Sequence, residues 1–453
     1  MAENIPLELG TESVGKLLRK YALPAIIAMT ASSLYNMIDS IFIGQGCGAM
    51  AISGLAITFP LMNLSSAFGT LVGVGAATLV SVLLGQRNYD VAKRVLNNVV
   101  ILNVLIGIVF STVSLVFLDS ILDFFGASDA TRPYAREYMI PILIGNIITH
   151  LYFGLNSIVR VSGHPQKAMY ATILTVGINT LLDPLFIFGF GMGIRGAAVA
   201  TVISQSISLI WILRILCDRK EFLHIDWRNM HLDTAIAKRS LSIGLAPFLM
   251  NSASCFVVIF INNQMMKYGG DLYIGAYGIN NRIVFLFLMI VIGLNQGMQP
   301  IAGYNYGAKK YDRALDVLGM TMRYACMVMS VLFLVGMFIP KTAVSIFTHD
   351  AEMIKIAAHG LTINVLVFLV VGRQMVISSF FQSLGMANKA IFLSLVRQVI
   401  VLLPCLAVLP RFFGIEGVWY SMPASDFIAV IISEVMLFQL KKSFKKEISA
   451  NEA

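Results

Sequence analysis

The sequence predicts an all-α polytopic membrane protein with twelve transmembrane helices in two six-helix lobes. Two observations support this fold class. The chain of 453 residues is 57% hydrophobic and 13% charged, with a mean hydropathy of +0.80, and its apolar residues come in long blocks. In addition, the second half of the chain is a diverged copy of the first. Internal repeats in so apolar a chain are typical of transporters.

The repeat is clearest in a twelve-residue stretch. Residues 85–96 (GQRNYDVAKRVL) return 222 positions later as residues 307–318 (GAKKYDRALDVL), with six identities among the twelve positions. The same offset relates four further pairs, namely Ile52 and Ile274, Gly75 and Gly297, Gly163 and Gly385, and Lys167 and Lys389. The duplication therefore extends over both halves of the chain.

Twelve apolar blocks are long enough to cross a bilayer. A helix that spans a hydrocarbon core of about 30 Å needs about 20 residues. The blocks lack the alternating pattern of a membrane β-barrel, so we expect helices. In order, they cover residues 21–43, 51–84, 95–118, 135–159, 168–190, 196–216, 241–266, 274–301, 317–339, 357–381, 390–410 and 416–440.

Basic residues are distributed unequally between alternate loops. If the N-terminus is cytoplasmic, most lysines and arginines outside the blocks fall on the inner side, which satisfies the positive-inside rule. The outward segments hold only Arg132, Arg136, Arg195, Lys267, Lys341, Lys355 and Arg411. We therefore expect a multi-pass protein of the plasma (inner) membrane with both termini in the cytoplasm. The net charge of +9 follows from this topology and implies no nucleic-acid partner.

The sequence divides into two lobes and a linker. We predict an N-terminal six-helix lobe over residues 1–217, a cytoplasmic linker over 218–239, and a C-terminal lobe over 240–453 with a short basic tail. Because six is even, the two lobes have the same orientation and form a parallel repeat around a central cavity. The linker is polar with interspersed apolar residues, and we expect an amphipathic segment at the membrane interface. These apolar residues are Phe222, Ile225, Trp227, Met230 and Leu232.

Cysteine and histidine give no sign of a cofactor. The five cysteines are scattered singly and the six histidines form no ligand motif, so we expect free thiols, no metal centre and no cofactor. The first apolar block is full length, so it is interpreted as a retained span and not as a signal peptide.

Two carboxylates lie deep in the N-terminal half. A charge inside a span costs roughly 2.5–3.5 kcal/mol on insertion scales, so Asp39 and Asp183 are candidate functional residues. Tyr35 shares a helix face with Asp39, and Asn179 with Asp183, since each pair is four residues apart. Pro184 frees a carbonyl one turn back. These groups predict an oxygen-rich pocket for a hard cation or a shared proton. The alternative is a network that only locks helices together.

The C-terminal half lacks this acidic pair. Under the repeat alignment, Asn262 and Pro404 take the places of the two acids. Two interpretations of the deep arginines stay open: they pair with Asp426, or they face the cavity as counter-charges. The deep charges are Arg282, Arg373, Arg397, Asp426 and Glu434.

The run from Asn179 to Thr201 (NTLLDPLFIFGFGMGIRGAAVAT) is the most specific feature. Its glycines permit a tight turn, and its small residues let helices approach closely. With this run, with Pro24 early in the first span, and with the repeated Gly-x-x-x-Lys-Ala element, the chain resembles the multidrug and toxic compound extrusion (MATE) family. The repeated element lies at residues 163–168 and 385–390.

The resemblance implies an ion-driven multidrug efflux antiporter with a V-shaped cavity that alternates between membrane faces, nearest to the DinF- and MepA-like members. It implies that H⁺ or Na⁺ couples at Tyr35, Asp39, Asn179, Asp183 and Thr201, with any Na⁺ bound at the two acids. It also implies helix bends at Pro24 and Pro184. The expected substrates are lipophilic, often cationic compounds.

Two other functions would need different residues in the membrane spans. A lipid-linked oligosaccharide flippase of the same wider superfamily needs a basic cavity, for which Arg282, Arg373 and Arg397 are the candidates. A membrane-embedded transferase needs clustered acids or a His-based nucleophile, and the apolar blocks contain neither motif. We therefore expect a transporter and not an enzyme. It contacts membrane lipids and small-molecule substrates, and a two-lobe cavity functions as a monomer.

Overall fold

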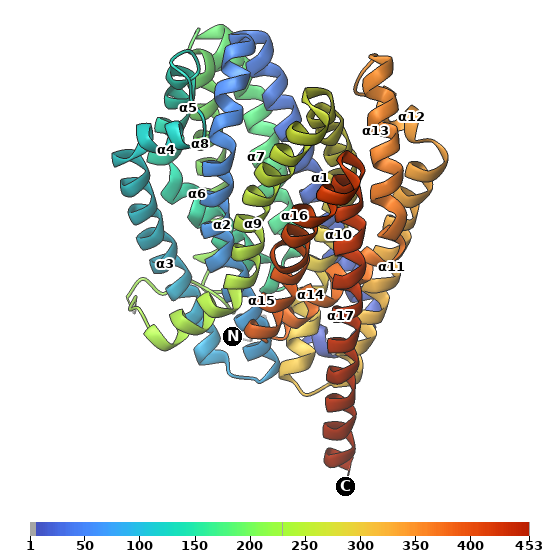
Figure 1. The fold of residues 1–453 in the computed structure, drawn as a ribbon. Helices are drawn as coiled ribbons and strands as arrows, with labels where there is room; N and C mark the ends of the chain where they lie inside the picture. Colours follow the sequence, from blue (N-terminus) through green and yellow to red (C-terminus); the bar gives the residue numbers. More distant parts are fainter. Residues whose placement is uncertain (1–5, 229, 453) are drawn as a thin grey trace. The chain divides into compact units, whose positions relative to one another are not determined.

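The computed structural model describes residues 6–228 and 230–452, which are helical with short connections and contain no β-strand (Figure 1). Residues 1–5, 229 and 453, which belong to the predicted lobes and linker, lie outside the described residues. In the first half the elements are η1 (Leu7–Gly10), α1 (Val14–Cys47), α2 (Ala49–Gly85), α3 (Tyr89–Val116), α4 (Leu118–Phe124), α5 (Arg132–Ile144), α6 (Asn146–Val161), α7 (Pro165–Pro184), η2 (Leu185–Gly189) and α8 (Gly193–Leu216).

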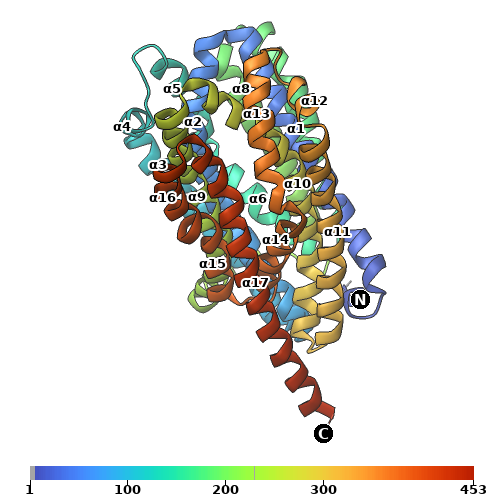
Figure 2. The ribbon, with the colours of Figure 1, turned by 45° about the vertical axis from the view of Figure 1, so that its right-hand side comes forward.

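The second half repeats this order. Its elements are α9 (Thr234–Gly269), α10 (Asp271–Gly307), α11 (Tyr311–Phe338), α12 (Pro340–Ser345), α13 (Ala351–Asn364), η3 (Val365–Val367), α14 (Phe368–Ser383), α15 (Ala387–Leu395), η4 (Val396–Leu402), α16 (Leu403–Phe413) and α17 (Ile415–Glu452). Figure 2 shows α11, α13, α14 and α17 from a second side.

The all-helical membrane architecture is confirmed. Eleven helices in the described residues are long and apolar enough to cross a membrane, and the number is twelve if one bent pair of helices is counted as a single span. This pair consists of α5 and α6, which meet at 56° around Gly145. The sequence predicted one uninterrupted block there, over residues 135–159. Hydropathy reports length and polarity, and it does not register a change of helix direction.

The chain forms two compact units that exchange short segments. Unit 1 contains residues 1–11 and 27–248, and unit 2 contains residues 12–26 and 249–453. The division differs from the boundary predicted at residue 240. In both halves, the point at which the chain passes from one unit to the other lies just after a proline. Helix α1 changes unit just after Pro24, and α9 changes unit just after Pro247, which is 223 residues later.

A glycine allows each exchanged segment to pack closely against another helix of the unit to which it belongs. In unit 1 a Cβ on Gly244 of α9 would lie 1.8 Å from the Leu71 carbonyl oxygen of α2. In unit 2 a Cβ on Gly297 of α10 would lie 2.4 Å from the Ala22 Cα of α1. Because real Cβ atoms do not approach other atoms so closely, the helix backbones touch at these points. The exchanged segments are therefore packed as parts of the units that hold them.

The backbone confirms the internal repeat. Arg87 and Lys309 are the only described non-glycine residues with positive φ, at 59° and 58°. Each lies two residues after the end of a long helix, α2 or α10, and the two are 222 residues apart. A positive φ is uncommon for a residue with a Cβ, so two matching cases indicate the same turn made twice.

The segment between α8 and α9 is attached to unit 1. Phe222 and Ile225 are buried, and the Phe222 ring lies 5.4 Å from that of Tyr89 and beneath the Lys93 ammonium. Trp227 stays 59% exposed. Part of the apolar face that was expected at the membrane interface therefore packs on the protein.

Candidate functional site

The two predicted acids of the N-terminal half meet inside unit 1. Asp39 lies on α1 and is 6% exposed, and Asp183 lies near the end of α7 and is 0% exposed. Asp39 lies one turn after Tyr35 on α1, and the Tyr35 hydroxyl is within hydrogen-bond distance of the Thr201 hydroxyl. The Asn179 amide donates to both Thr201 and Asp183, so the two acids belong to one buried polar site. Two carboxyl groups buried at one site resist ionising at the same time.

Helix α8 completes the site through Thr201. The Tyr35 hydroxyl lies 3.1 Å from the Thr201 hydroxyl, and the Asn179 amide donates to the same oxygen over 3.3 Å. The Asn179 amide also donates to Asp183 Oδ1 over 3.2 Å. The structure thus brings together all five residues that were predicted to couple a cation, from α1, α7 and α8.

Three buried oxygen atoms of this site have no hydrogen-bond partner among the described residues. They are Asp39 Oδ1, Asn179 Oδ1 and Asp183 Oδ2. A buried acceptor without a donor is costly, so such atoms are normally satisfied by water or an ion. Carboxylate and amide oxygens are ligands that hard cations prefer. The donor set fits a small hard cation or protonated water.

The local sequence explains how Asp183 is placed. Pro184 ends α7, and the chain continues as a π-helical turn over Leu185–Gly189, which widens the helix beside the acid. Helix α8 then packs closely on this turn. A Cβ on Gly196 would lie 2.9 Å from the Phe186 carbonyl carbon, so only glycine allows this approach. The predicted irregularity after Asp183 is therefore present.

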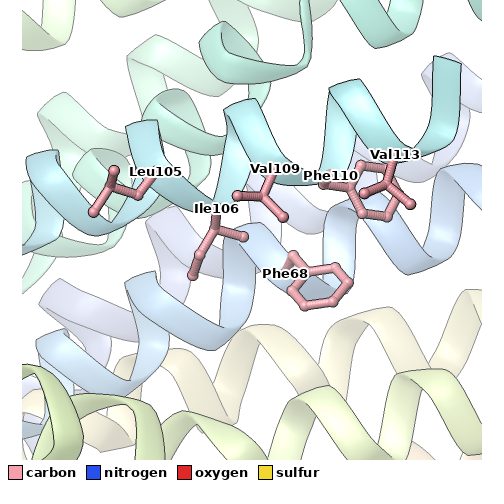
Figure 3. A pocket seen from close by; sticks show the side chains of 6 residues that line it. All are labelled: Phe68, Leu105, Ile106, Val109, Phe110 and Val113. Atoms are coloured by element: carbon pink, nitrogen blue, oxygen red, sulfur yellow. The ribbon is translucent and has the colours of Figure 1, made fainter. Parts of the chain in front are cut away.

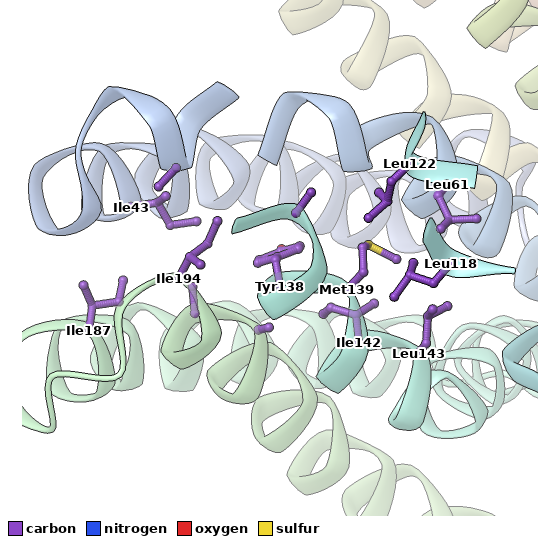
Figure 4. Close-up of a cluster of buried hydrophobic side chains, with 14 residues drawn as sticks. Ile43, Leu61, Leu118, Leu122, Tyr138, Met139, Ile142, Leu143, Ile187 and Ile194 are labelled. Atoms are coloured by element: carbon purple, nitrogen blue, oxygen red, sulfur yellow. The ribbon is translucent and has the colours of Figure 1, made fainter. Parts of the chain in front are cut away.

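Tyr138 is a member of the site that the sequence did not reveal. It lies on α5, is 1% exposed, and belongs to the same buried cluster as Ile43, which lies one turn after Asp39 on α1. Figure 4 shows Tyr138 within an apolar cluster between Ile194 and Met139. A single tyrosine in an apolar block carries no spacing signal, so sequence reasoning had no means to select it.

Unit 2 has no equivalent acidic pocket among its described residues. The motif Gly-Ile-x-Gly at the start of α8 recurs at the start of α17, which aligns Ala198 with Trp419 and Thr201 with Met422. Trp419 is completely buried in an apolar cluster that includes Ile261 and Leu406. A large indole thus occupies the place where unit 1 has small and polar groups.

The deep charges of unit 2 pair with one another. Arg397 binds Asp426 over 2.6 Å, and Arg373 binds Glu434 over the same distance. The predicted pairing with Asp426 is therefore present for Arg397, and Arg373 pairs with a different acid, Glu434. Arg282 of α10 has an exposed side chain. Since two of its three candidate arginines bind carboxylates, the flippase function has little basic surface to support it.

A shallow hollow on unit 1 lies away from the acids. It encloses about 380 Å³ between α2 and α3 (Figure 3). Its lining is apolar, and Val109 and Val113 are at least half exposed. Such a surface suits acyl chains and offers no group for chemistry. The lining residues are Phe68, Leu105, Ile106, Val109, Phe110 and Val113.

The described part of the chain contains no group of three or more His, Cys, Asp or Glu side chains that could hold a metal ion. The five cysteines are free thiols in the structure.

Comparisons with known proteins agree with this architecture. The MatE family model matches residues 24–185 and again residues 243–406, once in each half of the chain. The multidrug export protein MepA of Staphylococcus haemolyticus is 26% identical over 429 residues, which cover 95% of this chain and 94% of MepA. MepA of Staphylococcus aureus is similar to the same degree, with 26% identity over 428 residues.

Solved structures show the same fold. The MATE multidrug transporter DinF-BH, whose structure holds a bound small molecule, superposes with a TM-score of 0.90 at 34% identity, over 97% of this chain and 98% of that one. An outward-facing MATE family transporter superposes with a TM-score of 0.91 at 23% identity, again over 97% and 98% of the two chains.

Proposed function

The chain belongs to the MatE family of multidrug efflux transporters, and from this premise we propose that it is a cation-coupled antiporter. In this proposal H⁺ or Na⁺ enters the site formed by Asp39 and Asp183, and lipophilic, often cationic compounds leave the cell. The protein works as a monomer in the plasma membrane with both termini in the cytoplasm, and it needs no cofactor.

The observation that supports this proposal is the buried acid pair with its unpaired oxygens. Two carboxyl groups buried at one site resist simultaneous ionisation, so their charge changes readily when a proton or another cation arrives. A cationic substrate is attracted while the pair carries negative charge. Once H⁺ or Na⁺ neutralises the pair, this attraction is lost and the substrate is released.

In this proposal the transporter opens alternately to the two sides of the membrane. Substrate and coupling ion compete for the same carboxylates, so the transporter exchanges one for the other as it opens to either side of the membrane. Because each ligand shifts the conformational equilibrium only by its differential affinity, competition at one charged site is sufficient to couple the two movements.

The test uses purified protein in liposomes and ethidium, a fluorescent lipophilic cation. Transport is measured under an imposed proton gradient and, separately, under a sodium gradient. We expect one gradient to drive it, and we expect Asp39→Asn and Asp183→Asn each to abolish it. Asp119→Asn is the matched control, because Asp119 is a half-exposed acid that pairs with Arg136 away from the site.

Size-exclusion chromatography establishes that each variant is folded and monodisperse. Full driven transport in both Asp39→Asn and Asp183→Asn would refute the assignment of coupling to this pair. Loss of transport in Asp119→Asn as well would show that the assay reports folding and not coupling.

A further inference from the structure

A line of polar side chains continues along α7 away from the acid pair. Below Asp183 it contains Asn179, Thr175 and Thr172, which are spaced by four or three residues and so lie on one helix face. Each of these side chains hydrogen-bonds to a neighbouring helix within unit 1. This line is separate from the apolar surfaces that hold the unit together.

Neighbouring helices provide the partners of this line. On α8, Ser208 is completely buried and accepts a hydrogen bond from Thr175 over 2.7 Å. On α6, the Asn156 amide donates to Thr172 over 3.2 Å and the Tyr152 hydroxyl donates over 3.4 Å.

A second connection runs between α6 and α8. The Thr149 hydroxyl donates to Gln205 Oε1 over 2.5 Å, and Gln205 lies one turn beyond Thr201 of the acid site. Along these helices, hydrogen-bonding side chains therefore recur about once per helical turn, roughly every 5.4 Å, between the acids and Tyr152.

Helix packing alone does not explain all of these groups. Serine and threonine in membrane helices often bond back to their own helix or join two helices. Packing does not require buried acceptors without donors, yet Asn179 Oδ1 at one end and Asn156 Oδ1 at the other have no partner among the described residues. Asn179 is 1% exposed and Asn156 is 7% exposed. Such atoms are normally satisfied by internal water.

The internal repeat provides a comparison within the same chain. Unit 2 keeps the lowest contact, because Ser378 and Ser394, each 222 residues after Asn156 and Thr172, lie 3.4 Å apart. The upper positions differ. Val371, Met422 and Ala429 stand where unit 1 has Thr149, Thr201 and Ser208, whereas the ion-paired Arg397 and Asp426 stand at the positions of Thr175 and Gln205. Among the described residues, the line of hydroxyl groups and amides thus belongs to the unit that contains the acid pair, and unit 2 has an ion pair in the middle of the corresponding line.

The line points toward a charged cluster beyond the start of α7. Glu221 accepts from Lys167 over 3.0 Å, and its second oxygen lies 2.7 Å from His164 Nε2. Lys167 is five residues before Thr172, a distance of about 7.5 Å along the helix. The positive-inside rule puts this end of α7 on the cytoplasmic side.

We propose that this polar line, defined as Asn179, Thr201, Gln205, Thr149, Ser208, Thr175, Tyr152, Thr172 and Asn156, carries protons between the acid pair and the cytoplasmic end of unit 1. The proposal rests on the proposed function with H⁺ as the coupling ion. Hydroxyl groups and internal waters each accept one proton and pass on another, while the amides hold the waters in place. One proton crosses per transfer, and none is consumed.

Thr175 allows a sharp test, because it lies midway along the line and Thr180 on the same helix is a matched control. Both threonines are half-buried and bond to the carbonyl four residues earlier, but the structure gives only Thr175 a bond to another helix. Proteoliposomes would carry wild type, Thr175→Val, Thr175→Ser or Thr180→Val. Proton-driven ethidium transport would be compared with ethidium exchange at equilibrium, in which no net proton transfer is needed.

The proposal predicts that Thr175→Val slows proton-driven transport at least tenfold and leaves ethidium exchange within twofold of wild type. Thr175→Ser, which retains the hydroxyl, and Thr180→Val should both behave as wild type. Equal proton-driven rates in Thr175→Val and Thr180→Val would overturn the proposal, as would an equal loss of exchange and driven transport in Thr175→Val.

The failure of the proposed function is distinguishable from this result. If sodium alone drives wild-type transport and Asp39→Asn abolishes it, the antiporter stands and the proton line is overturned, since the coupling ion is then not H⁺. If neither gradient drives wild-type transport, both proposals fail.

Discussion

Replacing Gly244 by alanine tests the close contact that fixes the exchanged segment in unit 1. The added Cβ would lie 1.8 Å from the Leu71 carbonyl oxygen, whereas ordinary contacts begin at 3.4 Å. Helices α2 and α9 must therefore separate by about 1.6 Å, the difference between these two distances. The obstructing atom belongs to the backbone, so it cannot rotate away as a side chain could.

The expected cost lies at the upper end of the range for overpacking, about 3 kcal/mol. For a domain the size of unit 1, each kcal/mol corresponds to roughly 2–4 °C in Tm, so we expect a decrease of about 6–12 °C. Gly278→Ala is the control. It lies inside α10 and its added Cβ would meet nothing within 4 Å. Alanine should there raise helix stability by about 0.5–1 kcal/mol.

The assay is thermal unfolding of the purified protein in detergent, followed by fluorescence-detected size-exclusion chromatography. The reasoning is refuted if Gly244→Ala and Gly278→Ala have the same Tm, because the helices would then have room that the structure denies.

Three other changes have expected outcomes. Asp426→Asn leaves Arg397 without its ion partner and should cost about 3–5 kcal/mol of stability, which a neutral replacement of both residues should largely restore in thermal unfolding. Thr201→Val removes the hydrogen-bond partner of Tyr35 and should lower the stability by about 1–3 kcal/mol. It should also lower the rate of driven ethidium transport, and an unchanged rate would exclude Thr201 from coupling. Burial alone would raise the pKa of Glu221, but hydrogen bonds and charges from His164 and Lys167 outweigh it and hold the pKa below its usual value. The contact of Glu221 with His164 and Lys167 therefore stabilises the linker above about pH 4.5 and is lost as the pH falls further. The rate at which an acid protease cleaves residues 218–233 should rise as the pH falls over that range. A constant rate would show that this contact does not hold the linker in place.

The sequence was sufficient for the spans and the repeat. Span number follows from hydropathy, because each crossing needs about 20 apolar residues whatever the helices contact. The repeat follows from identity at a constant offset, and matching backbone angles at Arg87 and Lys309 confirm it. The acid site was also predictable in part, because Asp39 and Asp183 are conspicuous in apolar helices.

Other features depend on contacts between distant parts of the chain. Tyr138 joins the acid site only because α5 packs on α8 and α2. Likewise, composition left open which acid each arginine of unit 2 binds, and packing decided that Arg397 meets Asp426. The exchange of segments after Pro24 and Pro247 has no sequence signal beyond the prolines themselves.

The sequence by itself thus determined how many helices cross the membrane, that one half repeats the other, and which half carries the acids. These properties depend on the length and polarity of single segments. Only the tertiary structure decided the partners of Asp39, Asp183 and Asp426 and the unit to which each exchanged segment belongs. Partners are chosen where side chains from separate helices meet, and that meeting depends on close packing of the whole unit and not on any one segment.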